Sequence, residues 1–176
     1  MTVDEFLVWA EGRPGRYELV DGEIFAMSPE RARHGLVKYA AQTALHRAIG
    51  QAGLACHMLP DGMTVRIDAT TTFEPDALVY CGPLIDLDAV EVPNPVIVVE
   101  VLSPGTKSVD TGTKLIGYFK VASLCHYLIL DPVDHIVIHH RRGAVKGVET
   151  DIVSEGILHL SPPGLQIAVA ELFIEV

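Results

Sequence analysis

Two spacings of apolar residues alternate along this chain and divide it into helices and strands. Residues 2–10 carry apolar side chains at helical spacing and predict a short N-terminal helix, which ends in a lead-in rich in glycine and proline. Residues 17–27 contain two β-prone runs on either side of Asp21 and Gly22. Asp-Gly tolerates the positive φ angles of a tight turn, so this segment predicts a β-hairpin.

A longer helix is predicted from Ser28 and Pro29 to Gly53. Serine is a good N-cap, and proline suits the first helical position because its missing N–H has no partner there anyway. Alanine-rich apolar positions recur at helical spacing in this segment, so the helix can pack closely against a sheet. Gly53 favours the left-handed conformation that ends a helix. A third helix is predicted over residues 108–121.

The remaining patterned segments predict strands. Residues 95–102, PVIVVEVL, form the most apolar run and predict a central strand that is covered on both faces. Further strands are predicted at residues 63–67, 73–80, 125–131, 134–140 and 148–156. This order predicts an α/β (α+β) fold, a mixed β-sheet flanked by helices. We expect a single domain over residues 1–176, with residues 1–15 as its N-terminal helix and lead-in.

Composition narrows the class of protein. A hydrophobic content of 49% and a mean hydropathy of +0.31 are ample for a packed core. We expect no membrane span, because no run approaches the roughly 18 apolar residues that a span needs, and no secretory signal at the N-terminus. The net charge of −10 disfavours a protein that coats nucleic acid non-specifically. It does not exclude a nuclease, because carboxylates of a metal site contribute negative charge.

The chain has three cysteines, Cys56, Cys81 and Cys125, which are isolated from one another. An odd number without a CxxC pair does not suit a disulfide framework. Reduced thiols and a cytoplasmic location are the simplest expectation.

Two carboxylates stand out as candidates for chemistry. Glu100 lies inside the most apolar strand, where a buried carboxylate must be protonated, paired or bound to a metal. Asp76 follows Pro75 at the start of another apolar strand. If these two strands pair, the carboxylates converge and provide the oxygen ligands that Mg²⁺ prefers. The alternative is that Glu100 pairs with a lysine or arginine for structural reasons.

The order of Pro75, Asp76 and an apolar strand that carries Glu100 is similar to the PD-(D/E)xK nuclease superfamily, also called restriction-endonuclease-like. A longer series resembles the bacterial Uma-two family of endonucleases; it comprises YELVDGE, Ser28-Pro29, His34, Pro75-Asp76, VVEVLSP, Asp110, Lys114 and Tyr118. Leu102 stands where the superfamily pattern has its lysine. The resemblance implies that Lys114, on the next helix, takes its place.

The resemblance also implies roles for these residues. Asp76, Glu100, Glu18 and the Val101 carbonyl hold Mg²⁺ or Mn²⁺, and Lys114 orients water or stabilises the transition state during DNA hydrolysis. His34 and Tyr118 are auxiliary. We expect Lys114→Met to abolish cleavage and leave the melting temperature nearly unchanged.

Structural alternatives exist for each of these side chains. Lys114 can form a surface ion pair with Asp110, worth about 0.3–0.5 kcal/mol. Glu18 can be an exposed hairpin residue, and His34 an exposed helix residue. His139 and His140 are adjacent in a strand and face opposite ways, so they cannot share a metal.

The resemblance implies DNA as the partner. Cleavage of both strands of a duplex favours a homodimer. The alternatives are a catalytically inactive nucleic-acid-binding or structural protein of the same fold, and an enzyme that uses the carboxylates for acid–base chemistry on another substrate.

Overall fold

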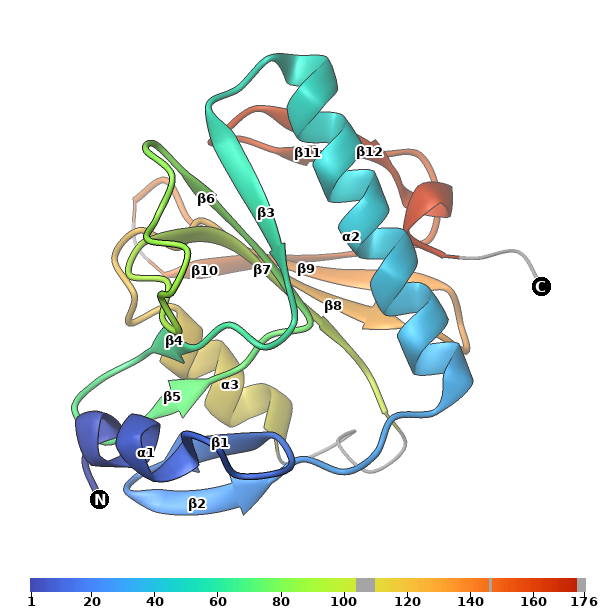
Figure 1. Ribbon diagram of the computed structural model, residues 1–176. Helices are drawn as coiled ribbons and strands as arrows, with labels where there is room; N and C mark the ends of the chain where they lie inside the picture. Colours follow the sequence, from blue (N-terminus) through green and yellow to red (C-terminus); the bar gives the residue numbers. More distant parts are fainter. Residues whose placement is uncertain (104–109, 146, 174–176) are drawn as a thin grey trace.

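The computed structural model describes residues 1–103, 110–145 and 147–173, without the side chains of Asp110 and Thr111 (Figure 1). Its centre is a six-stranded sheet in the order β10-β9-β8-β7-β6-β3. The strands are β3 (Cys56–Pro60), β6 (Ala77–Cys81), β7 (Pro95–Val101), β8 (His126–Asp131), β9 (Ile136–Arg142) and β10 (Val148–Val153). Strands β7 and β8 are parallel, and the other neighbours are antiparallel. The predicted mixed sheet flanked by helices is confirmed.

A second sheet of four short strands lies beside the first, in the order β2-β1-β5-β4. It contains β1 (Tyr17–Val20), β2 (Glu23–Ala26), β4 (Val65–Arg66) and β5 (Thr72–Phe73). The predicted hairpin is confirmed, and its turn residues Asp21 and Gly22 have φ angles of 50° and 82°. Helix α1 (Val3–Ala10) is also confirmed, with Thr2 and Glu5 forming a capping box.

Helix α2 (Ala32–Ala52) begins later than predicted. Ser28 and Pro29 lie in the preceding extended segment, and Arg31 is the N-cap without a side-chain hydrogen bond. The predicted end is confirmed, because Gly53 adopts the left-handed conformation with φ 62°.

Two strand predictions need correction, and three strands were missed. Residues 63–67 hold only the two-residue β4, and residues 73–80 divide between β5 and β6, which belong to different sheets. Strand β3 and the hairpin of β11 (Ile157–Leu160) and β12 (Leu165–Ala168) were not predicted. A 3-10 helix, η1 (Val169–Leu172), follows β12.

The six-stranded sheet is covered on both faces. On one face, α2 packs through Val37, Ala41 and Ala44 against a core that also includes the β11–β12 hairpin and η1. On the other face, α3 (Asp110–Tyr118) and the short strands β4 and β5 enclose a second core. In Figure 1, α2 and α3 lie on opposite sides of the sheet. This cover on both faces is what the apolar run of β7 predicts.

The cysteines differ from the expectation. Cys56 of β3 and Cys81 of β6 are directly opposite in the antiparallel ladder and form a disulfide. The prediction of three reduced thiols is therefore wrong, and Cys125 is the free cysteine among the described residues. The cytoplasmic location stays a prediction, and the Cys56–Cys81 disulfide removes the argument from reduced thiols that supported it. No helix in the described part of the chain combines the length and the apolar character needed to cross a membrane.

Gly117 allows α3 to lie directly on the aromatic ring of Phe73. A Cβ atom added at Gly117 would lie 2.6 Å from Cε2 of Phe73, which is closer than carbon atoms approach. Lys114 and Tyr118 flank this position on the same helix. The glycine therefore sets the distance between α3 and the strand residues that face it.

We expect Gly117→Ala to lower the free energy of unfolding by about 1–3 kcal/mol, because the added methyl group overpacks the contact with Phe73. Gly112→Ala on the same helix is the matched control, since a Cβ there meets nothing within 4 Å. It should raise stability by about 0.5–1 kcal/mol, because alanine is the better helix former. Urea denaturation measures both. Equal stabilisation by Gly117→Ala and Gly112→Ala would contradict the close contact between α3 and Phe73.

Candidate functional site

A buried lysine joins three elements of the fold. Lys114 of α3 is only 5% exposed, and its Nζ lies 2.9 Å from Oε1 of Glu18 on β1 and 3.0 Å from Oε1 of Glu100 on β7. The alternative of a surface ion pair with Asp110 does not fit this burial, although the side chain of Asp110 lies outside the described residues. Because two buried carboxylates would lose their cation, the structure favours a loss of stability in Lys114→Met over an unchanged melting temperature.

Tyr118 completes this group from the next turn of α3. Its hydroxyl donates to Oε1 of Glu100 at 2.8 Å, and its ring packs against Phe73 and Tyr127. Burial and the charge of Glu100 raise the pKa of Tyr118 well above its usual value, so the hydroxyl keeps its proton. The spacing of four residues on one helix face is what brings Lys114 and Tyr118 to the same carboxylate.

Glu18 points inward from β1. It is buried, and its Oε1 also accepts a hydrogen bond from the backbone N–H of Glu74 at 3.0 Å. The alternative of an exposed hairpin glutamate is therefore wrong.

Asp76 lies just before β6 and is 4% exposed. Its Oδ2 accepts a hydrogen bond from the N–H of Val101 at 2.7 Å, and its backbone carbonyl accepts one from Gln42 of α2. Burial opposes ionisation, but the hydrogen bond and charge of His34 and the Val101 N–H lower the pKa of Asp76 below its usual value. Asp76 is therefore a fixed, ionised carboxylate.

His34 of α2 lies against Asp76, and 11% of its side chain is exposed. Its Nε2–H donates to the Val101 carbonyl at 2.9 Å and lies 3.4 Å from Oδ2 of Asp76. Burial opposes protonation, but the nearby Asp76 and Glu30 raise the pKa of His34. The surface-histidine alternative does not fit, because the ring occupies the space between α2 and the sheet.

The predicted site residues thus form two groups. One contains Glu18, Glu100, Lys114 and Tyr118, and the other contains His34, Asp76 and Val101. They meet at β7, where Glu100 and Val101 are consecutive. Burial raises the pKa of Glu100 to about 8; Lys114 opposes this rise, and the charges of Asp76 and Glu18 add to it. Its side chain is 14% exposed.

Buried carboxylates close to one another fit a divalent cation, which would offset the burial and the negative charges that raise the pKa of Glu100. Asp76, Glu100 and Glu18 are the oxygen ligands available for it. Lys114 contacts two of these carboxylates, and the Val101 carbonyl accepts a hydrogen bond from His34. The pairing of Glu100 with Lys114 is also what the structural alternative requires.

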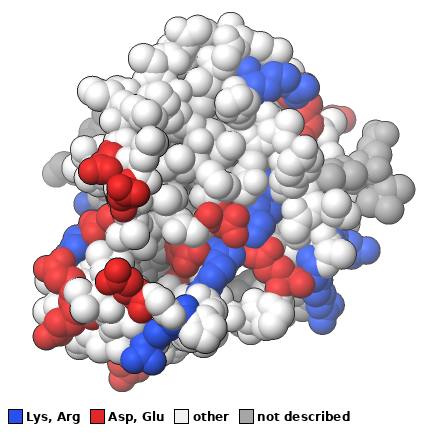
Figure 2. Space-filling model, viewed as in Figure 1, with Lys and Arg blue, Asp and Glu red and all other residues white. Residues whose placement is uncertain are grey.

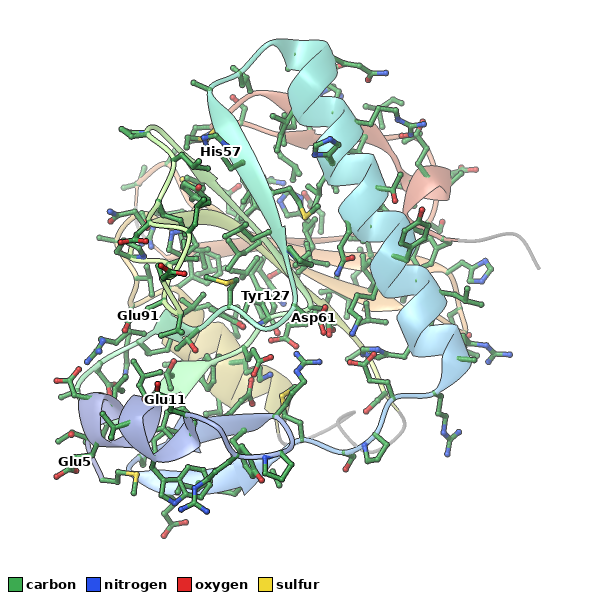
Figure 3. The ribbon with its side chains drawn as sticks, viewed as in Figure 1. Glu5, Glu11, His57, Asp61, Glu91 and Tyr127 are labelled. Atoms are coloured by element: carbon green, nitrogen blue, oxygen red, sulfur yellow. A yellow bond between two sulfur atoms is a disulfide. The ribbon has the colours of Figure 1, made fainter. Side chains whose placement is uncertain are left out.

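Sequence reasoning missed a network of charged side chains that borders the second group. Arg16 contacts Glu30, Asp61 and Glu74 at 2.6–2.9 Å. Lys38 of α2 contacts Glu30 and Asp61 at 2.6 and 3.0 Å. Figure 2 shows acidic and basic side chains together across the middle of this face, and Asp61 is labelled there in Figure 3. These residues come from loops and a helix without any periodic signal, so the sequence offers little to find them.

Two buried histidines from neighbouring strands are in contact. His126 of β8 and His139 of β9 lie 2.9 Å apart between Nδ1 and Nε2, and Nε2 of His126 lies 2.8 Å from the Pro162 carbonyl. Burial and the charges of His126 and Arg141 lower the pKa of His139 to about 4. The pair connects the sheet to the segment between β11 and β12, and it lies apart from the residues of the two groups.

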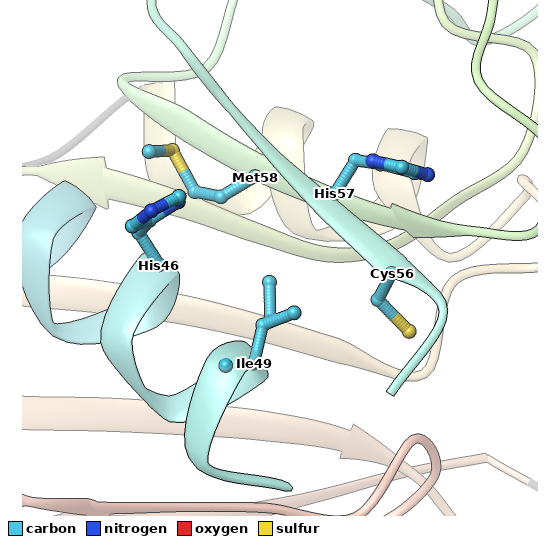
Figure 4. Close-up of a pocket in the computed structure, with 6 residues that line it drawn as sticks. His46, Ile49, Cys56, His57 and Met58 are labelled. Atoms are coloured by element: carbon cyan, nitrogen blue, oxygen red, sulfur yellow. The ribbon is translucent and has the colours of Figure 1, made fainter. Parts of the chain in front are cut away.

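A cavity of about 220 Å³ lies between α2 and β3 (Figure 4). It is lined by His46, Ile49, Gly50, Cys56, His57 and Met58. None of the predicted site residues lines it, so it is not part of the candidate centre.

Comparisons with known proteins agree with this fold. A family model, Uma2, described as "Putative restriction endonuclease", matches residues 3–170. An uncharacterized protein, slr1290, from Synechocystis is 26% identical over 171 residues, which cover 96% of this chain and 89% of that protein. The fold is similar to a crystal structure from Anabaena variabilis described as "a putative nuclease belonging to DUF820". The TM-score is 0.74 at 14% identity, with coverage of 98% of this chain and 97% of that one.

The raised pKa of Glu100 predicts a pH dependence of stability. In the absence of metal, the folded protein holds a proton on Glu100 up to about pH 8, whereas the unfolded chain releases it near 4.5. The folded state therefore binds more protons between these values, and the Glu100 contribution to stability falls as pH rises through this window. The Glu100→Gln variant should lose less stability between pH 5 and pH 8 than the unaltered protein, as measured by urea midpoints in EDTA. Parallel pH profiles would show that Glu100 ionises normally.

Proposed function

We propose, from the premise that this chain belongs to the Uma2 family, that it is a metal-dependent endonuclease that hydrolyses DNA phosphodiester bonds. The family description points to a nuclease, and the DNA substrate and the metal dependence are the proposal. The observation that carries it is that Lys114 contacts Glu100 on β7, while the N–H of the next residue, Val101, donates to Asp76.

Each residue has a role in this proposal. Asp76 and Glu100, with Glu18 and the Val101 carbonyl, hold Mg²⁺ or Mn²⁺. When bound, the ion supplies Lewis acidity and lowers the pKa of water. The ammonium of Lys114 stabilises negative charge that develops on the phosphoryl oxygens, and its buried position strengthens this effect. Tyr118 fixes the orientation of Glu100, and His34 fixes the Val101 carbonyl.

In hydrolysis, a water oxygen forms a bond to phosphorus, and the bond from phosphorus to the leaving sugar oxygen breaks. The leaving oxygen takes up a proton. Leu102 occupies the usual lysine position, so this chemistry depends on Lys114. If Lys114 only neutralises the two glutamates, the protein is an inactive nucleic-acid-binding or structural relative.

We also propose that residues 1–176 act as one domain and that two copies pair. Strand β10 forms one edge of the six-stranded sheet, and such an edge can be covered by a second copy. Light scattering of the purified protein measures its oligomeric state directly. A monomeric mass at the concentrations used for the assays would contradict the dimer.

We expect the purified protein to nick supercoiled plasmid with Mg²⁺ or Mn²⁺ and not with EDTA. Asp76→Asn and Glu100→Gln should lower the rate by about 100-fold or more, because each keeps its hydrogen-bond acceptor and loses the charge. The Val101 N–H and the Lys114 and Tyr118 donors then keep their partners, so the fold is maintained. Circular dichroism measures whether the two variants keep the fold. Tight binding of DNA without nicking would instead favour the inactive relative.

Lys114→Met should lower nicking by a similar factor and also destabilise the protein by about 3–5 kcal/mol, because Glu18 and Glu100 lose their cation. Lys120→Met is the matched control, since Lys120 follows the same helix and forms an exposed ion pair with Asp68. It should change neither the rate nor the melting temperature appreciably. Normal cleavage by Lys114→Met, measured at a temperature where it stays folded, would remove Lys114 from the mechanism.

A further inference from the structure

Three potential metal ligands meet on the α2 side of Asp76. One ligand atom each from Glu30, His34 and Asp76 lies within 4.8 Å of the other two. Glu30 precedes α2, and His34 lies in its first turn, four residues further along the chain. Nδ1 of His34 is 3.4 Å from Oε2 of Glu30. Of these three, only Asp76 belongs to the metal ligands of the proposed function.

The Nδ1 atom of His34 is buried and has no hydrogen-bond partner among the described residues. The other nitrogen, Nε2, donates its proton to the Val101 carbonyl. In the neutral ring, the lone pair of Nδ1 therefore faces the carboxylate of Glu30, and two acceptors oppose each other with nothing between them. Either a second proton or a cation must relieve this arrangement.

The geometry suits a cation. Ligands bound to one tetrahedral ion at about 2.1 Å lie about 3.4 Å apart, and this is the separation of Nδ1 and Oε2. A histidine that binds metal through one nitrogen usually donates its other N–H to a carbonyl or carboxylate. The hydrogen bond from Nε2 to Val101 is of this kind, and it leaves Nδ1, beside Glu30, as the ligand atom; Asp76 lies 3.4 Å from the other nitrogen.

The surrounding charge also favours a cation. Among the described residues, the two groups and the bordering network contain six carboxylates, Glu18, Glu30, Asp61, Glu74, Asp76 and Glu100, and three permanent cations, Arg16, Lys38 and Lys114. Negative charge therefore exceeds positive charge here. Arg16 and Lys38 both contact Oε1 of Glu30 and hold this carboxylate beside His34, and Lys38 also contacts Oε2.

We propose that Glu30, His34 and Asp76 bind a divalent cation through one imidazole nitrogen and two carboxylates. An imidazole ligand favours Mn²⁺ or Zn²⁺ over Mg²⁺, which prefers oxygen ligands and water. This inference deepens the proposed function. It rests on that function in one respect, because Asp76 is a metal ligand in both. Cation binding itself can be measured without DNA.

The test uses the full chain after treatment with EDTA. Calorimetric titration with MnCl₂ and with MgCl₂ should give an affinity at least about tenfold higher for Mn²⁺. Pulsed electron paramagnetic resonance of the Mn²⁺-loaded protein should show coupling to a directly bound ¹⁴N. His34→Ala should abolish this coupling and weaken Mn²⁺ binding by about 10-fold or more.

His46→Ala is the matched control, because His46 is an exposed residue on the same helix. It should leave the coupling and both affinities unchanged. If His34→Ala does not fold, labelling the histidines of the unaltered protein with ¹⁵N should convert the ¹⁴N coupling into a ¹⁵N coupling. Equal affinities for Mn²⁺ and Mg²⁺, no detectable binding, or a nitrogen coupling that persists in His34→Ala would overturn the inference.

The plasmid assay separates this inference from the proposed function. Nicking by the unaltered protein with Mg²⁺, together with no nitrogen coupling in its Mn²⁺-loaded form, would leave the nuclease standing and remove this site. Mn²⁺ bound through His34 without nicking under any condition would confirm the site and remove the nuclease.

Discussion

The ammonium of Lys114 between Glu18 and Glu100 is the interaction on which the candidate centre depends. Burial of a carboxylate is unfavourable unless a partner neutralises it, and here one lysine contacts two carboxylates from different sheets. The contact connects β1, β7 and α3, so it fixes the small N-terminal sheet against the central one. Burial still raises the pKa of Glu100 to about 8 despite Lys114, and the charges of Asp76 and Glu18 add to this rise; a divalent cation would counteract it.

The packing around this contact explains how Lys114 and Tyr118 are positioned. Gly117 lets α3 lie on Phe73, and the rings of Phe73 and Tyr127 flank Tyr118. A helix held this closely presents Lys114 and Tyr118 to the same carboxylate. On the other side of β7, α2 brings His34 to Asp76, so the two helices approach the strand from opposite faces and the candidate centre lies between them. The strand that carries Glu100 and Val101 is thus the common element of both groups.

Features with a local cause could be predicted from the sequence. The Asp21-Gly22 turn, the end of α2 at Gly53 and the anomalous Glu100 each follow from a few neighbouring residues, and the family resemblance supplied Lys114. Features that depend on distant partners could not be predicted. The start of α2 at Ala32 lacks a side-chain cap, the Cys56–Cys81 pair forms only because β3 and β6 are neighbours, and Glu30 joins Arg16 and Lys38 through loops. Residues 73–80 looked like one strand because the local pattern does not reveal that Phe73 and Ala77 belong to different sheets.

The separation of 96 residues between Glu18 and Lys114 has a consequence for the growing chain. During synthesis, Glu18, Asp76 and Glu100 all leave the ribosome before the lysine that neutralises two of them. A nascent chain that stops before α3 therefore carries the acidic residues without their internal cation and cannot assemble the centre. Any chemistry that needs Lys114 begins only after most of the chain has been made.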